Sequence, residues 1–153
     1  MAKPTETTVE NPLALQEQVC FALAVASRSV VALYRPVLEP MGLTHPQYLV
    51  MLALWEHGSV SVRELSHLLQ LDPGTLSPLL KRLESTGLVR RERNPNDERA
   101  LAVELTREGR ALRRRALKVP PAVVERLGMD VDELKALQRR LNRVIDAATR
   151  APA

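Results

Sequence analysis

The chain has 153 residues, 45% hydrophobic and 26% charged, which is the composition of an ordinary globular domain and excludes wholesale disorder. Its single cysteine excludes an internal disulfide and a cysteine-rich zinc site, and we expect no metal and no cofactor. No apolar run approaches the roughly 20 residues that span a bilayer, and the polar N-terminus is unlike a signal peptide. The sequence therefore predicts a soluble cytoplasmic protein without membrane contact.

Basic residues are concentrated in one part of the chain. The net charge is +4, and residues 81–118 alone carry 12 basic and 6 acidic side chains. A local basic excess is what a polyanionic partner such as nucleic acid requires. Charge alone leaves open the alternative of an arginine-rich surface that faces only solvent.

The N-terminal part reads as a flexible tail followed by a long apolar helix. Residues 1–10 are polar and predict the tail. Asn11 as N-cap and Pro12 at the first helical position predict a helix over residues 13–34, ended by Pro36 and by residues 40–42. This helix is apolar around most of its circumference, so it needs cover on nearly all sides. A second copy of the chain is the economical explanation.

Three capped helices follow. Each begins at a Thr, Ser or Asp whose side chain can accept a hydrogen bond from the first turn, and two of them have the Glu or Gln of a complete capping box. The predicted helices run from Thr44 to Trp55 with a stop at Gly58, from Ser61 to Leu69, and from Asp72 to just before Gly87, with an extended link at residues 59–60.

The next segment changes from helical to alternating periodicity. Residues 88–93 and 100–105 flank the turn-forming residues 94–97, and apolar side chains alternate along the second run. The pattern predicts a two-stranded hairpin with a polar tip. Two helices are expected after it, one from Thr106 to about Lys118 that is broken by Pro120 and Pro121, and one from Asp130 to about Ala148.

This order of elements predicts a mainly α fold with a small β-wing. Three helices followed by a hairpin are the layout of a winged helix-turn-helix, which we place at residues 45–106. Residues 11–44 and 107–150 would be N- and C-terminal dimerisation helices. The prediction is a single domain over residues 11–153.

The helix after Asp72 is the candidate recognition helix, because it is the second helix of the turn pair. Its leucines mark a buried face and leave a polar, basic face exposed. Hydroxyls and amides near its N-terminus can approach base edges or phosphates, and later basic side chains add charge. The candidate DNA-contacting residues on and before this helix are Arg63, Pro73, Gly74, Thr75, Ser77, Pro78, Lys81 and Arg82.

Arginines also surround the predicted hairpin tip. An arginine there can enter the minor groove, and Asp97, two residues before Arg99, can hold that side chain in place. Helix and wing together predict binding of double-stranded DNA, with a homodimer reading a pseudo-palindromic operator. The candidate wing contacts are Arg91, Arg93, Asp97 and Arg99.

These motifs resemble the MarR family of bacterial regulators, and the resemblance covers about residues 16–148. The family motifs are Leu71-Asp72, Gly74 to Glu84, Gly87-Leu88-Val89, Asp97-Glu98-Arg99, Leu105-Thr106 and Gly109. Upstream segments resemble the organic hydroperoxide resistance regulators (OhrR-type) within it, namely Gln18 to Leu23, Tyr34-Arg35-Pro36, Gly42 to Leu49 and Leu54-Trp55. The resemblance implies a repressor in the bacterial cytoplasm, associated with the nucleoid.

The same resemblance places the family's peroxide-sensing cysteine on Cys20. It implies that the thiolate is oxidised by an organic hydroperoxide to a sulfenic acid, which condenses with a low-molecular-weight thiol and so releases the operator. One activating tyrosine of the relatives falls on Tyr34, but another falls on Ala24 and a further one on His45, so the pocket is altered here. The implied redox-sensing residues are Cys20, Tyr34, His45 and Tyr48.

Spacing along the first helix adds a geometric expectation. Cys20 and Tyr34 lie 14 positions apart, or about 21 Å at 1.5 Å per residue, so they cannot touch within one continuous helix. Contact between them requires an antiparallel helix from a second chain. A sensor of this kind is built across a dimer interface.

Other functions remain open. A MarR-type repressor released by a small aromatic ligand, with Cys20 only structural, is compatible with the residues at Ala24 and His45. A thiol peroxidase acting through Cys20 is disfavoured, because no Ser-His-Asp, metal-ligand or glycine-rich phosphate pattern is present, and we expect no enzyme. A purely structural helical protein leaves the basic hairpin unexplained.

Overall fold

The computed structural model describes the backbone of residues 11–94 and 97–153 and the side chains of residues 11–93 and 101–153. The tail predicted at residues 1–10 lies outside the described residues. The helices are α1 (Val19–Leu38), α2 (His45–His57), α3 (Val62–Leu69), α4 (Pro73–Ser85), α5 (Arg107–Ala116), α6 (Val119–Leu127) and α7 (Val131–Arg150), with two short 3-10 helices, η1 (Leu15–Glu17) and η2 (Glu39–Met41). The strands are β1 (Val60–Ser61), β2 (Val89–Asn94) and β3 (Asp97–Leu105).

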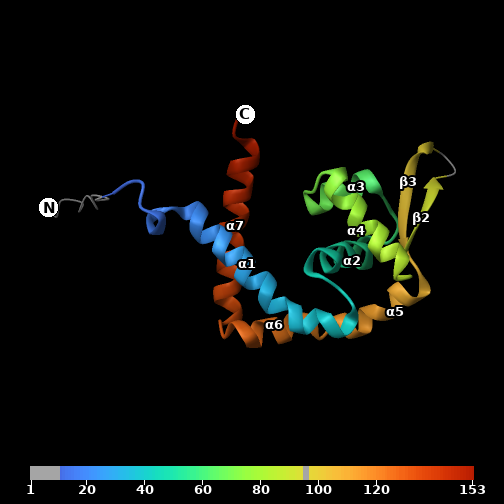
Figure 1. The fold of residues 1–153 in the computed structure, drawn as a ribbon, viewed down its shortest axis with the longest axis horizontal. Coiled ribbons are helices and arrows are strands. Elements are labelled where there is room, and N and C mark those ends of the chain that lie inside the picture. Colours follow the sequence, from blue (N-terminus) through green and yellow to red (C-terminus); the bar gives the residue numbers. More distant parts are fainter. Residues whose placement is uncertain (1–10, 95–96) are drawn as a thin grey trace.

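The chain forms a winged lobe joined to a pair of terminal helices (Figure 1). Helices α2, α3 and α4 and the β2–β3 hairpin make the lobe, and α5 and α6 lead from the base of the hairpin to the terminal helices. Helix α1 packs against α6 and α2, and α7 rises from the far end of α6. This arrangement confirms the predicted winged helix-turn-helix with terminal helices.

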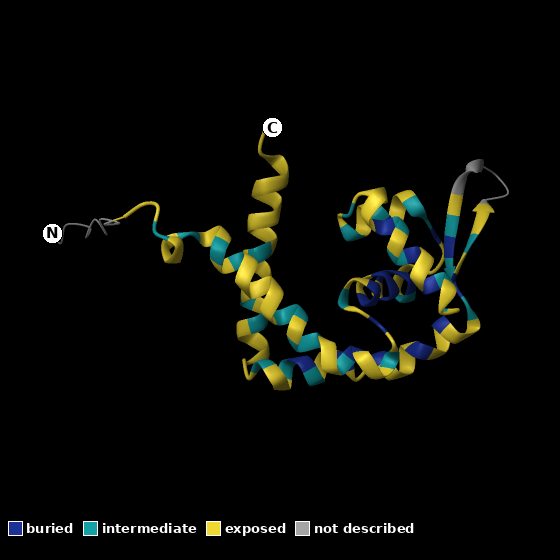
Figure 2. Ribbon diagram, viewed as in Figure 1, coloured by how far each residue is buried: buried dark blue, intermediate teal, exposed yellow. Residues whose placement is uncertain are grey.

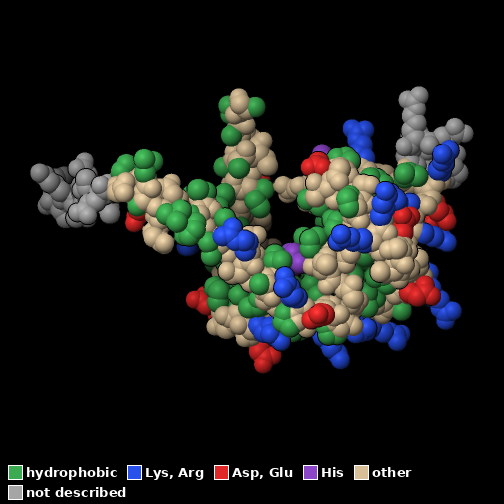
Figure 3. Space-filling view, in the orientation of Figure 1, with side chains coloured by type: hydrophobic (Ala, Val, Ile, Leu, Met, Phe, Trp, Pro, Cys, Tyr) green, Lys and Arg blue, Asp and Glu red, His purple; other side chains and the backbone are tan. Residues whose placement is uncertain are grey.

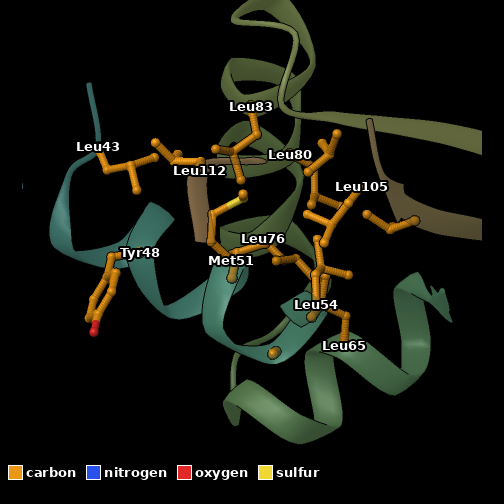
Figure 4. Packing of buried hydrophobic residues seen from close by; sticks show 14 of the residues in the cluster. Leu43, Tyr48, Met51, Leu54, Leu65, Leu76, Leu80, Leu83, Leu105 and Leu112 are labelled. Atoms are coloured by element: carbon orange, nitrogen blue, oxygen red, sulfur yellow. The ribbon is translucent and has the colours of Figure 1, made fainter. Parts of the chain in front are cut away.

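The hydrophobic core lies mainly inside the lobe (Figures 2 and 4). Met51 and Leu54 of α2 meet Leu65 of α3 and three leucines of α4, and these side chains are almost completely buried; the α4 leucines are Leu76, Leu80 and Leu83. Helices α1 and α7 are exposed along most of their length. The core therefore fixes the geometry of the lobe but leaves the terminal helices with little cover from their own chain.

The predicted helix starts are confirmed at three caps in the lobe. Thr44 and Ser61 each form a complete capping box, with Gln47 and Glu64 as the reciprocal partners. Asp72 accepts a hydrogen bond from the N–H of Thr75 at 2.8 Å. These local hydrogen bonds satisfy N–H groups that the first turn of each helix leaves unpaired.

The first long helix differs from its prediction at both ends. It begins at Val19, because the Asn11 side chain accepts the N–H of Leu13 in a local turn and caps no α-helix. It also continues through Pro36 to Leu38. Proline there lies in the last turn, and the full burial of Leu38 offsets the hydrogen bond that it removes.

Helix α6 was not predicted. Pro120 and Pro121 occupy its second and third residues, where a missing N–H has no intrahelical partner to lose. The two prolines therefore begin a helix, in addition to separating it from α5.

A third strand was also missed. Val60 and Ser61 of β1 pair antiparallel with Val103 and Ala102, so the sheet has the order β1-β3-β2. Two residues are too few to produce a visible alternation, and only the partner strand identifies them as a strand.

One described segment, Val19–Met41, is long and apolar enough to span a membrane by length and composition alone. The search for continuous apolar runs in the sequence missed this segment, because Arg28 and its serine neighbours interrupt the run. The same surface is what a helix at a protein–protein interface presents. Because this apolar surface is exposed in the single chain, the helix has no packing partner among the described residues that covers it.

Candidate functional site

The N-terminus of α4 is held by a hydrogen-bonded turn. Asp72 accepts the Thr75 N–H through Oδ1, and the Thr75 hydroxyl donates to Oδ2 at 3.1 Å. These hydrogen bonds from Thr75 hold the pKa of Asp72 below its usual value. The Thr75 hydroxyl oxygen keeps lone pairs that can accept a hydrogen bond from a ligand.

The exposed face of α4 carries most of the predicted contact residues. Leu76, Leu80 and Leu83 are fully buried on the opposite face. Ser77 is partly buried, whereas the remaining predicted residues of this helix are exposed, as is Arg63 on α3. Those exposed residues of α4 are Pro73, Gly74, Thr75, Pro78, Lys81 and Arg82.

The basic side chains of α4 are accessible, because Lys81 and Arg82 are both exposed. Lys81 and Arg82 make no ion pair with any of the described side chains. The Lys and Arg side chains visible in Figure 3 gather mainly over the lobe and the helices at its base. This face can therefore offer positive charge to a polyanion.

The wing arginines have different surroundings. Arg93 is exposed on β2, whereas Arg91 is hydrogen-bonded to Glu84 of α4. Arg90 lies near Glu104 of β3 and Glu92, with N···O distances of 3.3 and 3.4 Å. The side chains of Asp97 and Arg99 lie outside the described residues.

A cavity of about 1180 Å³ lies between the lobe and α7. Its lining combines cationic and hydroxyl groups, including Arg63, with the carboxylate of Asp146 and with apolar side chains such as Leu80 and Ile145. The Ser66 Oγ, also part of the lining, is buried and has no hydrogen-bond partner among the described residues. A site of this composition can accommodate an amphipathic anion.

The predicted redox residues fall into two separate places. Cys20 is exposed on the first turn of α1. Tyr34, His45 and Tyr48 form an aromatic cluster near the other end of that helix, with ring centroids 4.8 Å apart for Tyr34 and His45 and 5.9 Å apart for the two tyrosines. Because α1 is continuous from Cys20 to Tyr34, the thiol and the cluster of one chain stand about 21 Å apart along the helix.

Burial sets the protonation of the aromatic cluster. It raises the pKa of Tyr34 and, with a smaller contribution from Tyr34, that of Tyr48. It lowers the pKa of His45, because removal from water disfavours the charged imidazolium. At neutral pH the cluster therefore offers two hydroxyl groups and an imidazole that favours its neutral form.

Three residues that organise the site belong to the motifs quoted from the sequence but were given no role there. Glu84 binds Arg91, and the Trp55 Nε1–H donates to the carbonyl of Gly109 at 2.9 Å, which joins α2 to α5. An acidic residue at the end of the recognition helix, seven positions before a strand arginine, is the signal that could have identified Glu84. Among the described residues, no cluster of three or more His, Cys, Asp or Glu side chains is placed to hold a metal.

The fold and the exposed basic face together define a winged helix-turn-helix DNA-binding protein. The family described as "Transcriptional regulator SarA/Rot" matches residues 32–115. The chain belongs to the MarR/SarA family of transcriptional regulators. This membership also supports the expectation that the protein is not an enzyme.

Two curated relatives show the breadth of this similarity. The organic hydroperoxide resistance transcriptional regulator of Bacillus subtilis (strain 168) is 37% identical over 132 residues, which cover 86% of this chain and 90% of the relative. The HTH-type transcriptional regulator TtmR of Methylorubrum extorquens (strain PA1) is 44% identical over 133 residues, which cover 87% of this chain and 68% of the relative.

Two solved structures of DNA complexes share the fold. Reduced AbfR bound to DNA superposes with a TM-score of 0.72 and 32% identity, covering 90% of this chain and 96% of that chain. The transcriptional repressor CouR bound to a 23-mer DNA duplex gives a TM-score of 0.78 at 29% identity, covering 86% of this chain and 94% of that chain.

Proposed function

We propose that the protein is a homodimeric repressor that releases its operator when an organic hydroperoxide oxidises Cys20. The observation that carries this proposal is the placement of the exposed thiol and the aromatic cluster at opposite ends of one continuous helix. An antiparallel α1 from a second copy brings each thiol to the cluster of the other chain. The likeness to an organic hydroperoxide resistance regulator supports the same effector.

The DNA contacts are assigned to the lobe. The N-terminal residues of α4 reach base edges and phosphates, and Arg63, Lys81 and Arg82 bind phosphates. Arg93, Asp97 and Arg99 contribute from the wing. Two lobes related by a dimer axis read half-sites about one helical turn, roughly 34–36 Å, apart, so the operator is pseudo-palindromic. A regulator of bacterial DNA acts in the cytoplasm, at the nucleoid.

The dimer accounts for the uncovered terminal helices. Val19 and Val25 on α1 and Leu137 and Val144 on α7 are exposed in the single chain. Exposed apolar side chains on both terminal helices form a surface that a second copy covers.

The chemistry is a two-electron oxidation of sulfur. The Cys20 thiolate attacks one peroxide oxygen, the O–O bond breaks, and the alcohol leaves after taking up a proton, which converts the thiolate to a sulfenic acid. The hydroxyls and the neutral imidazole of the other chain's cluster hydrogen-bond to the thiolate and position the peroxide. A low-molecular-weight thiol then displaces water from the sulfenic acid to give a mixed disulfide, because the chain has no second cysteine.

The cavity between the lobe and α7 supports a second candidate. Its volume of about 1180 Å³ and its lining of Arg63 together with apolar side chains suit a small aromatic acid. A ligand there would change the placement of the lobe without any role for Cys20.

Fluorescence anisotropy of an operator fragment separates the two candidates. An organic hydroperoxide is titrated in the presence of a small thiol, for the wild type and for Cys20→Ser. We expect the wild type alone to lose DNA and to gain one thiol adduct per chain by intact mass. Undisturbed binding by both proteins contradicts peroxide sensing and directs the search to small acids.

A further inference from the structure

A paired contact links the recognition helix to the wing. The Glu84 carboxylate accepts the Arg91 backbone N–H through Oε1 at 3.1 Å, and its Oε2 accepts the Arg91 Nε–H at 3.0 Å and the Nη2–H at 2.8 Å. Both side chains are half-buried, with exposed fractions of 22% for Arg91 and 30% for Glu84. We call this set of contacts the Glu84–Arg91 clamp.

The clamp occupies the arginine that the sequence assigns to DNA contact. Two guanidinium donors and the backbone N–H are already used, and the charge of Arg91 is neutralised by the carboxylate beside it. The hydrogen bonds from Arg91 also hold the pKa of Glu84 below its usual value, so the carboxylate remains charged at neutral pH. A phosphate would have to displace a half-buried partner that already has paired hydrogen-bond geometry.

The clamp joins the end of the recognition helix to the first strand of the wing. Glu84 lies in the last turn of α4, and Arg91 is the third residue of β2. Between them the chain turns at Gly87, where φ is +77°, and the Leu88 N–H donates to the Leu83 carbonyl. These turn contacts hold the base of the wing, whereas the clamp joins the helix to the strand further toward the tip.

We propose that Glu84 and Arg91 are positioning residues that fix the angle between the recognition helix and the wing, and that Arg91 does not itself contact DNA. Both elements must reach the duplex at once, because the helix enters one groove while the wing reaches beside it. This inference rests on DNA binding, which family membership establishes, and is independent of the response to hydroperoxide.

The direction in which one substitution changes the affinity for DNA tests the clamp. Glu84→Gln removes a negative charge near the DNA-binding face, so simple electrostatics predicts tighter binding. The clamp predicts weaker binding, by about tenfold, because a charge-assisted contact that orients the wing is lost. Glu92→Gln is the matched control, since Glu92 lies on the same strand and, among the described side chains, pairs with Arg90. The affinity of this control variant for DNA should be unchanged or slightly higher.

Further variants distinguish positioning from direct contact. Arg91→Lys keeps the charge but loses the paired N–H geometry, and it should weaken binding as Glu84→Gln does. The double variant Glu84→Gln/Arg91→Lys should be no weaker than either single variant, because both remove the same interaction. Hydroxyl-radical footprints should lose the protection made by the wing and keep that made by α4.

Two results would overturn the clamp. One is tighter or unchanged binding by Glu84→Gln. The other is a hydroxyl-radical footprint of Glu84→Gln that keeps the protection made by the wing, because the clamp predicts that the wing is then no longer oriented toward the duplex. Circular dichroism and thermal melting identify a variant that has lost its fold, in which case Arg91→Lys, the milder change, decides the outcome.

Discussion

His45 is the residue that most changes what the proposed thiol site can do. It begins α2 and stands edge-on to Tyr34, with the ring planes inclined at 65°. An imidazole differs from a phenol because its protonation changes near neutral pH. In its neutral form, His45 can accept a hydrogen bond from a thiol, whereas the imidazolium can only donate.

The lowered pKa of His45 predicts a pH dependence of stability. Unfolding exposes the imidazole and returns its pKa toward the ordinary value of 6.5, so the unfolded chain binds more protons below that pH. The contribution to the free energy of unfolding is fully present above pH 6.5 and is lost as the pH falls through the lowered pKa of the folded state. Urea unfolding at pH 7.5 and pH 5.5 measures the loss.

The matched variant is His45→Gln, which keeps a polar side chain but cannot titrate. Its unfolding midpoint should fall less between the two pH values than that of the wild type. Equal pH dependence of the two proteins would show that the burial of His45 does not control this part of the stability curve.

At the scale of elements, one set of contacts joins the base of the wing and the start of α5 to the core. The Thr106 hydroxyl caps α5 and donates to the Gly87 carbonyl at 2.6 Å. Gly109, in the first turn of α5, lies directly against the Leu88 carbonyl, and its own carbonyl accepts the Trp55 Nε1–H. The junction therefore ties α2, α5 and the start of β2 together.

Gly109→Ala should destabilise this junction. An added Cβ would overlap the Leu88 backbone, which cannot move without disturbing β2, so we expect a loss of about 1–3 kcal/mol in the free energy of unfolding. Thermal and urea unfolding measure it. Gly74→Ala is the control, because a Cβ there meets only a side-chain oxygen of Asp72 at 3.3 Å. A Gly109→Ala protein as stable as the control would contradict the close approach.

At the scale of the whole molecule, the terminal helices leave many apolar side chains uncovered in the described part of the chain. Helix α1 has one fully buried side chain, Leu38, and none of the α7 side chains is buried in the single chain. A small domain rarely exposes so much contiguous apolar area without a partner. Proposed dimerisation through these helices would also set the distance between the two reading lobes.

Leu137→Asp tests that assembly. Leu137 is 44% exposed on α7, and a carboxylate placed in an apolar interface without a partner is costly. We expect sedimentation to show a monomer and operator affinity to fall at least tenfold. Leu68→Asp is the control, since Leu68 is 45% exposed on α3 and should leave the dimer intact. A dimeric Leu137→Asp protein would exclude α7 from the interface at this position.

Local sequence signals predicted much of this structure. Pairings between residues that are distant in the sequence could not be predicted. The caps at Thr44, Ser61 and Asp72 involve neighbours three residues away, so they can be identified directly in the sequence. Strand β1 depends on a partner more than 40 positions along the chain. The start of α6 was missed because prolines that follow one helix can equally begin the next.

The candidate site divides in the same way. Periodicity correctly placed the buried leucines of α4 and so the exposed face opposite them. From the sequence, Arg91 and Arg93 had the same predicted DNA contact, because only the folded position of Glu84 separates the two arginines. The distance between Cys20 and Tyr34 was predictable, since it depends only on helix continuity.

The most direct test of the account is a subunit complementation experiment on thiol oxidation. A heterodimer combines one Cys20→Ser subunit with one Tyr34→Phe subunit, so its single Cys20 faces an intact cluster only if the site crosses the dimer interface. Stopped-flow oxidation by an organic hydroperoxide should be slow in the Tyr34→Phe homodimer and return to the wild-type rate per thiol in the heterodimer. A heterodimer as slow as the Tyr34→Phe homodimer would contradict a thiol site shared between two chains.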